Sequence, residues 1–348
     1  MKPPVTVIMP AHNAEKWIGV AIASVLRQTH REFDLWVLEN GSTDGTLEVA
    51  KQFDDPRLKV FSLGRVGFQG ALQYAIENAK TDWLARMDAD DLMLPQRLQI
   101  QMEFLEKHPE FVFVGTAYAL LTPFGHIFER LPRIEARQVD REFLGVGRGR
   151  FGDPCTVFNR RAALETGGVD PEFTMGDVPL WFRLLTRGKG WQLGLPLHVY
   201  RMSPRSMSKD MAFIEECMRA RRKYAPEIVT SAFPKAATNC KGNFWGQIVL
   251  MELLAGDMKS MRQAIALLEQ EGDFGIEARR MLQRSYGGAL ASAAYRIRYR
   301  NRYRRRIDWE RDLAELEARS ADVGQSLMFE KERGITEGQQ TKETKAHA

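Results

Sequence analysis

Short apolar runs alternate with longer amphipathic segments along the first third of this 348-residue chain. Apolar runs of about five residues are typical of buried strands, and apolar residues three and four positions apart are typical of helices. The pattern predicts strands at 5–9, 33–38, 58–63, 83–87 and 111–115, and helices at 14–28, 46–53, 69–80 and 95–107. Because strands and helices alternate, we expect an α/β fold with a mostly parallel sheet flanked by helices.

Polar segments follow three of the predicted strands, at the point where each strand ends. They are Pro10–Asn13, Glu39–Asp44 and Asp88–Asp91. Ligands of parallel sheets bind beyond the carboxyl ends of the strands, so these segments are expected to meet in one crevice. Asp44 is also expected to cap the helix that begins near Thr46.

Asp88–Asp91 places three carboxylates within four positions, directly after an apolar strand. Like charges this close repel one another unless a cation or a polar ligand compensates them. Oxygen ligands at a strand end suit Mg²⁺ or Mn²⁺, which proteins often hold with one or two carboxylates and substrate phosphates. The alternative is a solvated acidic turn before a helix, where aspartate is also favourable.

Composition narrows the setting of the protein. The sequence has three widely spaced cysteines, Cys155, Cys217 and Cys240. Their odd number and spacing argue against a disulfide framework and a zinc site, and favour a reducing, cytoplasmic location. No signal peptide is recognisable, and the apolar stretch at 248–255 is too short to span a bilayer. We expect a soluble or peripheral protein.

Four ordered motifs resemble the family 2 glycosyltransferases. They are residues 5–14, 24–29, 39–46 and 85–91, and the resemblance is strong over 4–116 and weaker to about residue 208. It implies a GT-A fold with a Rossmann-like sheet and an inverting transfer of sugar from a nucleotide-diphosphate donor. The acceptor is expected to be a hydroxyl of a glycan or lipid-linked molecule, as in surface polysaccharide synthesis.

The resemblance also assigns the donor site. Asp88-Ala89-Asp90 looks like the DXD motif, with Asp90 as ligand of the divalent ion and Asp88 at the ribose or in the metal shell. Glu39-Asn40 stands where the family has two aspartates. A UDP-sugar is still the favoured donor, but the identity of its nucleotide base stays open. The residues expected at the donor are Pro10, Ala11, Asn13, Glu15, Glu39, Gly41, Gln73, Asp88, Ala89 and Arg201. Gln73 replaces a family Asn, and an ordinary polar helix position is its alternative. Arg201 or Arg205 suits the diphosphate because a guanidinium matches phosphate oxygens.

An inverting transfer needs a general base beside the acceptor hydroxyl. The family places it at a helix start, where this chain has Gly176-Asp177, so the resemblance makes Asp177 the base; a simple helix cap is the alternative. Asp153 and Trp181 are candidates for the acceptor side, against a loop acid and a core tryptophan, respectively. His198 is expected to fill a strand end rather than bind metal, and Asp91 to start the next helix.

The organisation predicted from these features is a catalytic domain at 1–208, with a donor half at 1–116 and an acceptor half at 117–208. A helical C-terminal region at 209–330 includes helices at 213–224, 244–255 and 258–269, and a polar, disordered tail follows at 331–348. Arginine and aromatic residues interleave at 295–309. An anionic membrane surface on the cytoplasmic side is favoured as their partner over nucleic acid, and a solvated helix is the alternative.

Two other classes were compared with an active transferase. A dinucleotide-dependent oxidoreductase is disfavoured, because Pro10-Ala11-His12-Asn13 follows the first strand instead of a glycine-rich turn. A sugar-binding or scaffold protein that has lost catalysis on the same fold remains the alternative, because Glu39-Asn40 and Gly176 depart from the family pattern.

Overall fold

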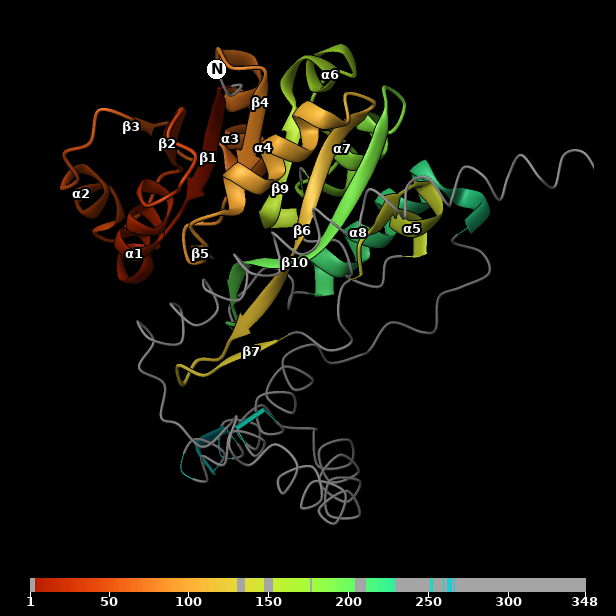
Figure 1. Ribbon diagram of the computed structural model, residues 1–348. Helices are drawn as coiled ribbons and strands as arrows, with labels where there is room; N and C mark the ends of the chain where they lie inside the picture. Colours follow the sequence, from red (N-terminus) through yellow and green to blue (C-terminus); the bar gives the residue numbers. More distant parts are fainter. Residues whose placement is uncertain are drawn as a thin grey trace, which may run out of the picture.

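A computed structural model describes residues 4–129, 135–146, 153–175, 177–203 and 211–228, with 251–252, 259, 262–264 and 266. These residues form one ten-stranded mixed sheet with helices on both faces (Figure 1). The α/β architecture predicted from the sequence is therefore confirmed.

The first half follows the predicted alternation of strands and helices. Its elements are β1 (Val5–Ala11), α1 (Glu15–Leu26), β2 (Phe33–Glu39), α2 (Thr46–Lys51), β3 (Leu58–Ser62), α3 (Gly67–Asn78), β4 (Trp83–Arg86), β5 (Leu92–Met93), α4 (Arg97–Lys107) and β6 (Phe111–Leu121). Strand β1 was expected to end before Pro10 but continues through it. Its ladder with β4 stops at Ile8, so the missing N–H of Pro10 breaks no bond on that side.

The second half adds three short strands, the long strand β10 and four helices among the described residues. They are β7 (Ile127–Glu129), β8 (Arg137–Val139), α5 (Arg141–Val146), the 3₁₀ turn η1 (Asp153–Cys155), β9 (Thr156–Asn159), α6 (Arg160–Glu165), α7 (Asp177–Leu184), β10 (Lys189–Arg201) and α8 (Met211–Tyr224). The predicted helix at 213–224 is thus present as α8.

The strand order is β3-β2-β1-β4-β9-β6-β10-β5, with β7 beside β6 and β8 beside β10. The first four strands are parallel, as predicted. Strand β9 then runs antiparallel between β4 and β6, so the last predicted strand of the first half is not a direct neighbour of the others. A segment of the acceptor half therefore completes the sheet of the donor half.

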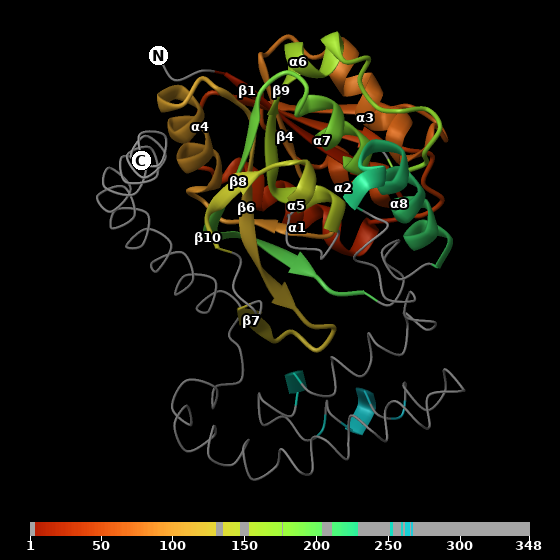
Figure 2. The same ribbon diagram turned by 90° about the vertical axis from the view of Figure 1, so that its right-hand side faces the viewer.

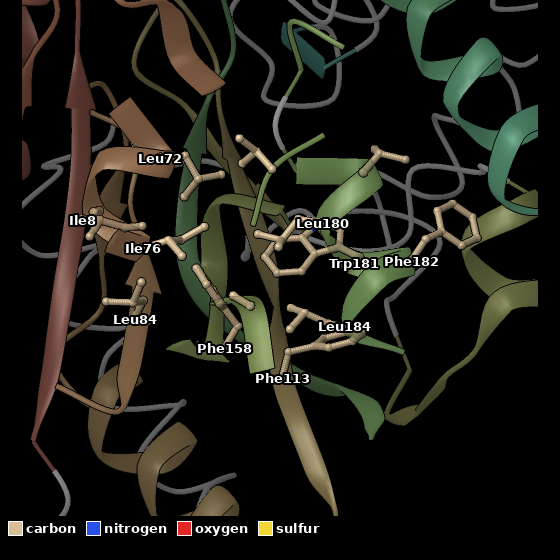
Figure 3. Close-up of a cluster of buried hydrophobic side chains, with 14 of the residues drawn as sticks. Ile8, Leu72, Ile76, Leu84, Phe113, Phe158, Leu180, Trp181, Phe182 and Leu184 are labelled. Carbon is tan, nitrogen blue, oxygen red and sulfur yellow. The ribbon is translucent and has the colours of Figure 1, made fainter. Parts of the chain in front are cut away.

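Alternate residues of the strands face two separate hydrophobic cores. Val7 and Met9 contribute to the core under α1 and α4, whereas Ile8 faces the core under α3 and α7. Figure 3 shows this second core, in which Ile8 and Leu84 lie opposite side chains of α7. Alternate side chains of a strand face the same core, and so do side chains three or four positions apart on the helices that cover the sheet. The apolar pattern of the sequence therefore predicted these elements.

Helix α8 packs on α5 and α7 and shares their core (Figure 2). The ring of its Tyr224 stacks on Phe182 of α7, with centroids 5.6 Å apart. Buried Asp170 accepts hydrogen bonds from Lys223 Nζ (2.8 Å) and Tyr224 Oη (2.6 Å), and Arg183 lies near the same carboxylate. These contacts join the start of the predicted C-terminal region to the acceptor half, and the boundary at residue 208 stays a prediction.

Further predictions fall largely outside the described residues. Of the helices predicted at 244–255 and 258–269, residues 251–252, 259, 262–264 and 266 are described, and all are helical. The arginine-rich segment 295–309 and the tail 331–348 lie outside the description. Among the residues that are described, no helix has the length and apolar character needed to cross a membrane.

Replacing Asp170 with Asn should lower the free energy of unfolding at neutral pH. Burial alone would raise the pKa of Asp170, but hydrogen bonds from Lys223 and Tyr224 outweigh it and lower the pKa to about 2. A lowered folded-state pKa stabilises above the unfolded value of about 3.9, so the contribution of about 2 kcal/mol should be lost as the pH falls from about 4 towards 2. Urea unfolding of wild type and Asp170→Asn across pH measures this loss. Exposed Asp54→Asn is the matched control, and an equal effect of both variants at pH 7 would contradict the assignment.

Candidate active site

The carboxyl ends of β1 and β2 carry two loops that are bonded to each other. Ala11, the last residue of β1, lies beside Glu39 at the end of β2. Asn13 has a φ of 51°, a left-handed conformation that asparagine tolerates better than most residues. Its Oδ1 accepts from Thr43 N (2.8 Å), and its own N–H donates to Ser42 Oγ (3.1 Å). The predicted meeting of Pro10–Asn13 with Glu39–Asp44 is confirmed.

Asp44 and Glu15 tie the starts of α1 and α2 together. The Asp44 carboxylate accepts from Glu15 N (3.2 Å) and Thr46 N (3.1 Å), so it satisfies free N–H groups of both helices. Glu15 in turn accepts from Gly45 N (3.2 Å). Gly45 holds the N-cap position of α2, and the Asp44 side chain binds the first N–H of the helix from the preceding position. Glu15 has a structural contact in addition to its predicted place at the donor.

Glu39 is a buried carboxylate at the base of the second loop. Its oxygens accept from Ser42 N–H and from Ser62 Oγ, the latter at 2.9 Å. Burial would raise the pKa of Glu39, but these hydrogen bonds outweigh it and hold the pKa below its ordinary value. Glu39 is therefore ionised at neutral pH, and both of its oxygens stabilise the loop.

Asn40 and Gly41 fix the second loop against the segment before α3. Asn40 Oδ1 accepts from Val66 N (2.8 Å) and Gly67 N (3.0 Å). Gly41 has a φ of 65°, and a Cβ there would lie 3.1 Å from the backbone N of Arg65. Both the backbone conformation and the close approach require glycine. The anchoring role of Asn40 was not predicted.

Gln73 joins α3 to the acceptor half. Its Oε1 accepts from Val169 N (3.0 Å), and its Nε2 donates to Glu77 (2.7 Å). A Cβ at Gly168, where φ is 67°, would lie 2.1 Å from Gln73 Oε1. Both ends of the amide are bonded within the protein, and the predicted contact of Gln73 with the donor stays a prediction.

The acidic loop, Asp88–Asp91, follows β4 and gives each carboxylate a different environment. Asp88 is partly exposed and pairs with Arg86 (Nη2 to Oδ1, 3.1 Å), and Ala89 is buried. Burial, together with repulsion from Asp91 and Asp88, raises the pKa of Asp90 to about 7. A bound cation would relieve the repulsion that causes this shift.

The acidic loop fits a divalent ion that shares its coordination with a substrate. Among the described residues, no group of three or more His, Cys, Asp and Glu side chains is placed to hold a metal. Mg²⁺ is commonly bound by one or two carboxylates together with phosphates and water, and Asp88 and Asp90 can supply the carboxylates. Asp91 is not part of this set, because its oxygens are used elsewhere.

Asp91 lies in a buried hydrogen-bonded chain. Its carboxylate accepts from His198 Nε2 (2.8 Å) and from Arg201 N (2.8 Å). The prediction that Asp91 starts the next helix is wrong: α4 begins only at Arg97, and the Asp91 side chain points into the protein instead of capping it.

His198 connects Asp91 to Arg97. Arg97 Nη1 lies 3.2 Å from His198 Nδ1, and a guanidinium can only donate. Nδ1 is therefore the acceptor, and Nε2 carries the proton donated to Asp91. Burial, with the nearby charge of Arg97, lowers the pKa of His198 well below its usual range. The imidazole is neutral and has both nitrogens bonded, so it is more than the filler that we predicted.

Arg201 lies against the acidic loop, where a diphosphate contact was predicted. Its Nε donates to the backbone oxygen of Asp90 (2.8 Å), and its guanidinium stacks 3.9 Å above the ring of Trp17. Trp17 fits the apolar spacing of its helix but is 41% exposed, because this ring supports Arg201 instead of packing in the core. The sequence pattern did not reveal that contact.

Asp177 is the buried first residue of α7, and its Oδ1 accepts from Val178 N (2.8 Å). Burial raises the pKa of its carboxyl, the positive charge of Arg86 opposes the shift, and the negative charge of Asp88 adds to it. The predicted base is therefore within electrostatic range of the acidic loop, although some ninety positions separate them in the sequence. The position of Asp177 at the start of α7 also fits the alternative, a simple helix cap.

Arg86 pairs with Asp88, its charge acts on Asp177, and it was missed by the sequence prediction. It is 2% exposed and lies 4.6 Å above the Phe68 ring, and its Nε and Nη1 have no hydrogen-bond partner within the described part of the chain. A single charge within the apolar run 83–87 was the signal that could have revealed it, because a buried charge requires a partner.

The two predicted acceptor residues have different outcomes. Trp181 is fully buried between Phe113 and Phe158, with ring centroids 5.6 and 5.7 Å away (Figure 3). It has no surface on which a sugar can stack, so its predicted acceptor role is wrong and the core alternative holds. Asp153 begins η1, its side chain lies outside the description, and its role stays a prediction.

Comparison with known proteins identifies the class. The model of the family described as Glycosyl transferase family 2 matches residues 6–167. Putative glycosyltransferase EpsE of Bacillus subtilis is 31% identical over 209 residues, which cover 57% of this chain and 73% of that protein. The O-antigen biosynthesis glycosyltransferase WbnJ of Escherichia coli is 30% identical over 223 residues, covering 61% and 85%. The chain belongs to glycosyltransferase family 2 and is a glycosyltransferase.

Solved structures show the same fold. S. aureus TarS 1-349 in complex with UDP-GlcNAc has a TM-score of 0.53 at 16% identity, covering 77% of this chain and 92% of that one. The mannosyltransferase PcManGT from Pyrobaculum calidifontis, in complex with GDP-Man and Mn2+, has a TM-score of 0.52 at 18% identity, covering 93% and 87%. The predicted GT-A fold is confirmed.

Gly41→Ala should destabilise the protein more than Gly64→Ala. Both glycines have a positive φ, so both variants incur the left-handed penalty of about 1–2 kcal/mol. Only at Gly41 does the new Cβ also approach a backbone, since nothing lies within 4 Å of a Cβ at Gly64. Urea unfolding of the two variants measures the difference. Equal losses would show that the contact with Arg65 is not what requires glycine at position 41.

Proposed function

We propose that this glycosyltransferase inverts the anomeric centre while moving a sugar from a nucleotide-diphosphate donor to a hydroxyl of a glycan or lipid-linked acceptor. The proposal includes a role in polysaccharide synthesis, as the names of two relatives suggest. One is WbnJ, and the other is the amylovoran biosynthesis glycosyltransferase AmsE of Erwinia amylovora, 27% identical over 188 residues that cover 70% of it. TarS and PcManGT, whose structures contain UDP-GlcNAc and GDP-Man, support a nucleotide-sugar donor.

The observation that carries this proposal is the effect of the acidic loop and Arg86 on the buried carboxyl of Asp177. Asp88 and Asp90 follow the end of β4, and Asp177 is the first residue of α7. The charges of Arg86 and Asp88 both act on the pKa of Asp177, which supports a place for the base near the acidic loop. The proposal puts the donor sugar between the acidic loop and Asp177.

In this mechanism the acceptor oxygen bonds to the anomeric carbon, and the bond from that carbon to the diphosphate breaks. Asp177 takes the hydroxyl proton, and burial favours this role because it raises the proton affinity of the carboxylate. Arg201, placed by Asp90 and Trp17, binds the departing diphosphate.

Asp90 and Asp88 would hold Mn²⁺ or Mg²⁺. When bound, the ion neutralises charge that develops on the leaving diphosphate. The residues of β1 and β2 at the crevice, Pro10, Ala11, Asn13, Glu39 and Gly41, would contact the nucleotide. The segment 295–309 remains a candidate contact with an anionic membrane surface on the strength of its composition alone.

A nucleoside diphosphate with Mn²⁺ should raise the melting temperature. Ligand at about 100 times its Kd adds about 2.7 kcal/mol to the free energy of unfolding. A thermal-shift series with UDP, GDP and dTDP, each with and without Mn²⁺, shows which nucleotide base the protein prefers. We expect the largest shift for UDP and a smaller one without metal, and no shift in any arm would contradict a nucleotide-sugar donor.

Asp90→Ala and Asp177→Asn should both abolish most turnover but differ in binding. Loss of one electrostatic contact to the transition state costs about 10²–10³ in kcat, and loss of a general base about 10²–10⁴. Release of nucleoside diphosphate from a panel of nucleotide sugars measures turnover, and calorimetry measures binding. Asp90→Ala should lose Mn²⁺-dependent nucleotide binding, whereas Asp177→Asn should keep it.

Exposed Asp54→Asn is the control for these variants. Wild-type turnover in Asp90→Ala and Asp177→Asn would overturn the assigned roles. Nucleotide-sugar binding by the wild type without transfer to any acceptor or to water would favour the alternative of a sugar-binding protein that has lost catalysis.

A further inference from the structure

We propose that Arg97, His198 and Asp91 form a buried clamp that holds the acidic loop in the shape required for donor binding. Arg97 and His198 would be positioning residues that do not touch the substrate themselves. This inference rests on the proposed function, because the clamp affects activity only if the acidic loop binds the metal ion and the diphosphate. The contacts that support it lie at both ends of the loop.

The entrance of the acidic loop is held by Arg97. Its Nη2 donates to the backbone oxygen of Arg86 (2.7 Å), the last residue of β4 and two positions before the loop, and its Nε donates to Gln101 Oε1 (3.1 Å). Gln101 Nε2 donates in turn to the backbone oxygens of Val114 (2.8 Å) and Cys155 (2.9 Å). The guanidinium is therefore anchored in β6 and η1, so the entrance of the loop is fixed to the centre of the sheet.

The exit of the acidic loop is held by β10. The Asp91 carboxylate accepts from His198 Nε2 and Arg201 N, and the short strand β5 pairs antiparallel with β10, with His198 opposite Met93. The register of β10 against β6 shifts on both sides of Pro196. Such irregularities re-aim side chains, and His198 lies within the second one, between Pro196 and Val199.

His198 connects the two ends. Its Nδ1 accepts from Arg97 and its Nε2 donates to Asp91, so one neutral imidazole joins the group at the entrance to the group at the exit. All three side chains are at most 1% exposed. Water is therefore excluded from replacing a lost bond, and removal of the imidazole leaves the buried polar groups of Arg97 and Asp91 without this link.

The position of Asp90 depends on both ends of the loop. It lies directly before Asp91, and its backbone oxygen accepts from Arg201, whose own N–H is bonded to Asp91. If the clamp opens, Asp90 and Arg201 move together. A displacement of about 1 Å at a reacting site can cost about 10²-fold in rate, so a small relaxation is sufficient to impair donor binding.

His198→Leu and His198→Gln test the clamp. Leucine removes both hydrogen bonds, whereas glutamine retains one donor and one acceptor. We expect His198→Leu to weaken binding of UDP with Mn²⁺ by at least about tenfold and to raise the donor KM similarly, with His198→Gln recovering most of the loss. Calorimetry and steady-state kinetics measure these effects, and urea unfolding records stability separately. If UDP gives no thermal shift, the nucleotide with the largest shift replaces it.

Arg97→Lys provides a second test if His198→Leu does not fold. It keeps the buried charge but loses the fork that reaches Arg86, His198 and Gln101, so it should also weaken UDP–Mn²⁺ binding. Gln28→Met is the matched control: Gln28 is fully buried, and its bonds to Leu94 O (2.7 Å) and Leu98 N (2.9 Å) lie beyond the acidic loop. It should lower stability without changing affinity.

Asp90→Ala separates failure of the clamp from failure of the proposed function. Loss of Mn²⁺-dependent binding in Asp90→Ala, with wild-type affinity in folded His198→Leu or Arg97→Lys, would overturn the clamp alone. Wild-type binding in Asp90→Ala would overturn the metal site on which the clamp depends. Reduced stability with unchanged affinity in the clamp variants would show that Arg97, His198 and Asp91 serve folding only.

Discussion

The mutual repulsion of three carboxylates at the end of β4 is the constraint on which the site depends. The structure compensates each one differently: Asp88 pairs with Arg86, and Asp91 is enclosed by hydrogen-bond donors from β10. Asp90 is left with a pKa raised to about 7 by burial and by its neighbours. The ionised form of Asp90 is therefore unfavourable in the free protein. A divalent ion bound with a diphosphate would stabilise it.

The predicted acceptor half, which follows residue 116, is part of the framework of the predicted donor half. Strand β9 completes the sheet beside β4, and the Gln73 amide binds the turn at Val169. Helix α8 adds a further set of contacts through Asp170, which lies in the segment that leads to α7. The position of Asp177 at the start of α7 therefore depends on packing that spans both halves.

Much of the first half was predictable because its side chains follow simple periods. Strands buried on both faces appear as short apolar runs, and their helices carry apolar stripes. Motif order then located the acidic loop and Asp177. Trp181, Asp91 and His198 were misjudged for one shared reason: their roles depend on partners far along the chain, such as Phe113 for Trp181 and His198 for Asp91.

The sequence by itself determined the alternating elements, the family and the polar segments at the strand ends, because these features are local in the chain. Only the tertiary structure decided which groups satisfy the buried charges. A lone arginine in an apolar strand, or a histidine near a strand end, acquires a role when folding brings a partner within hydrogen-bond distance and excludes water. Arg86 and His198 acquired their roles in this way, because the partners that matter for them depend on β4, α4 and β10 coming together.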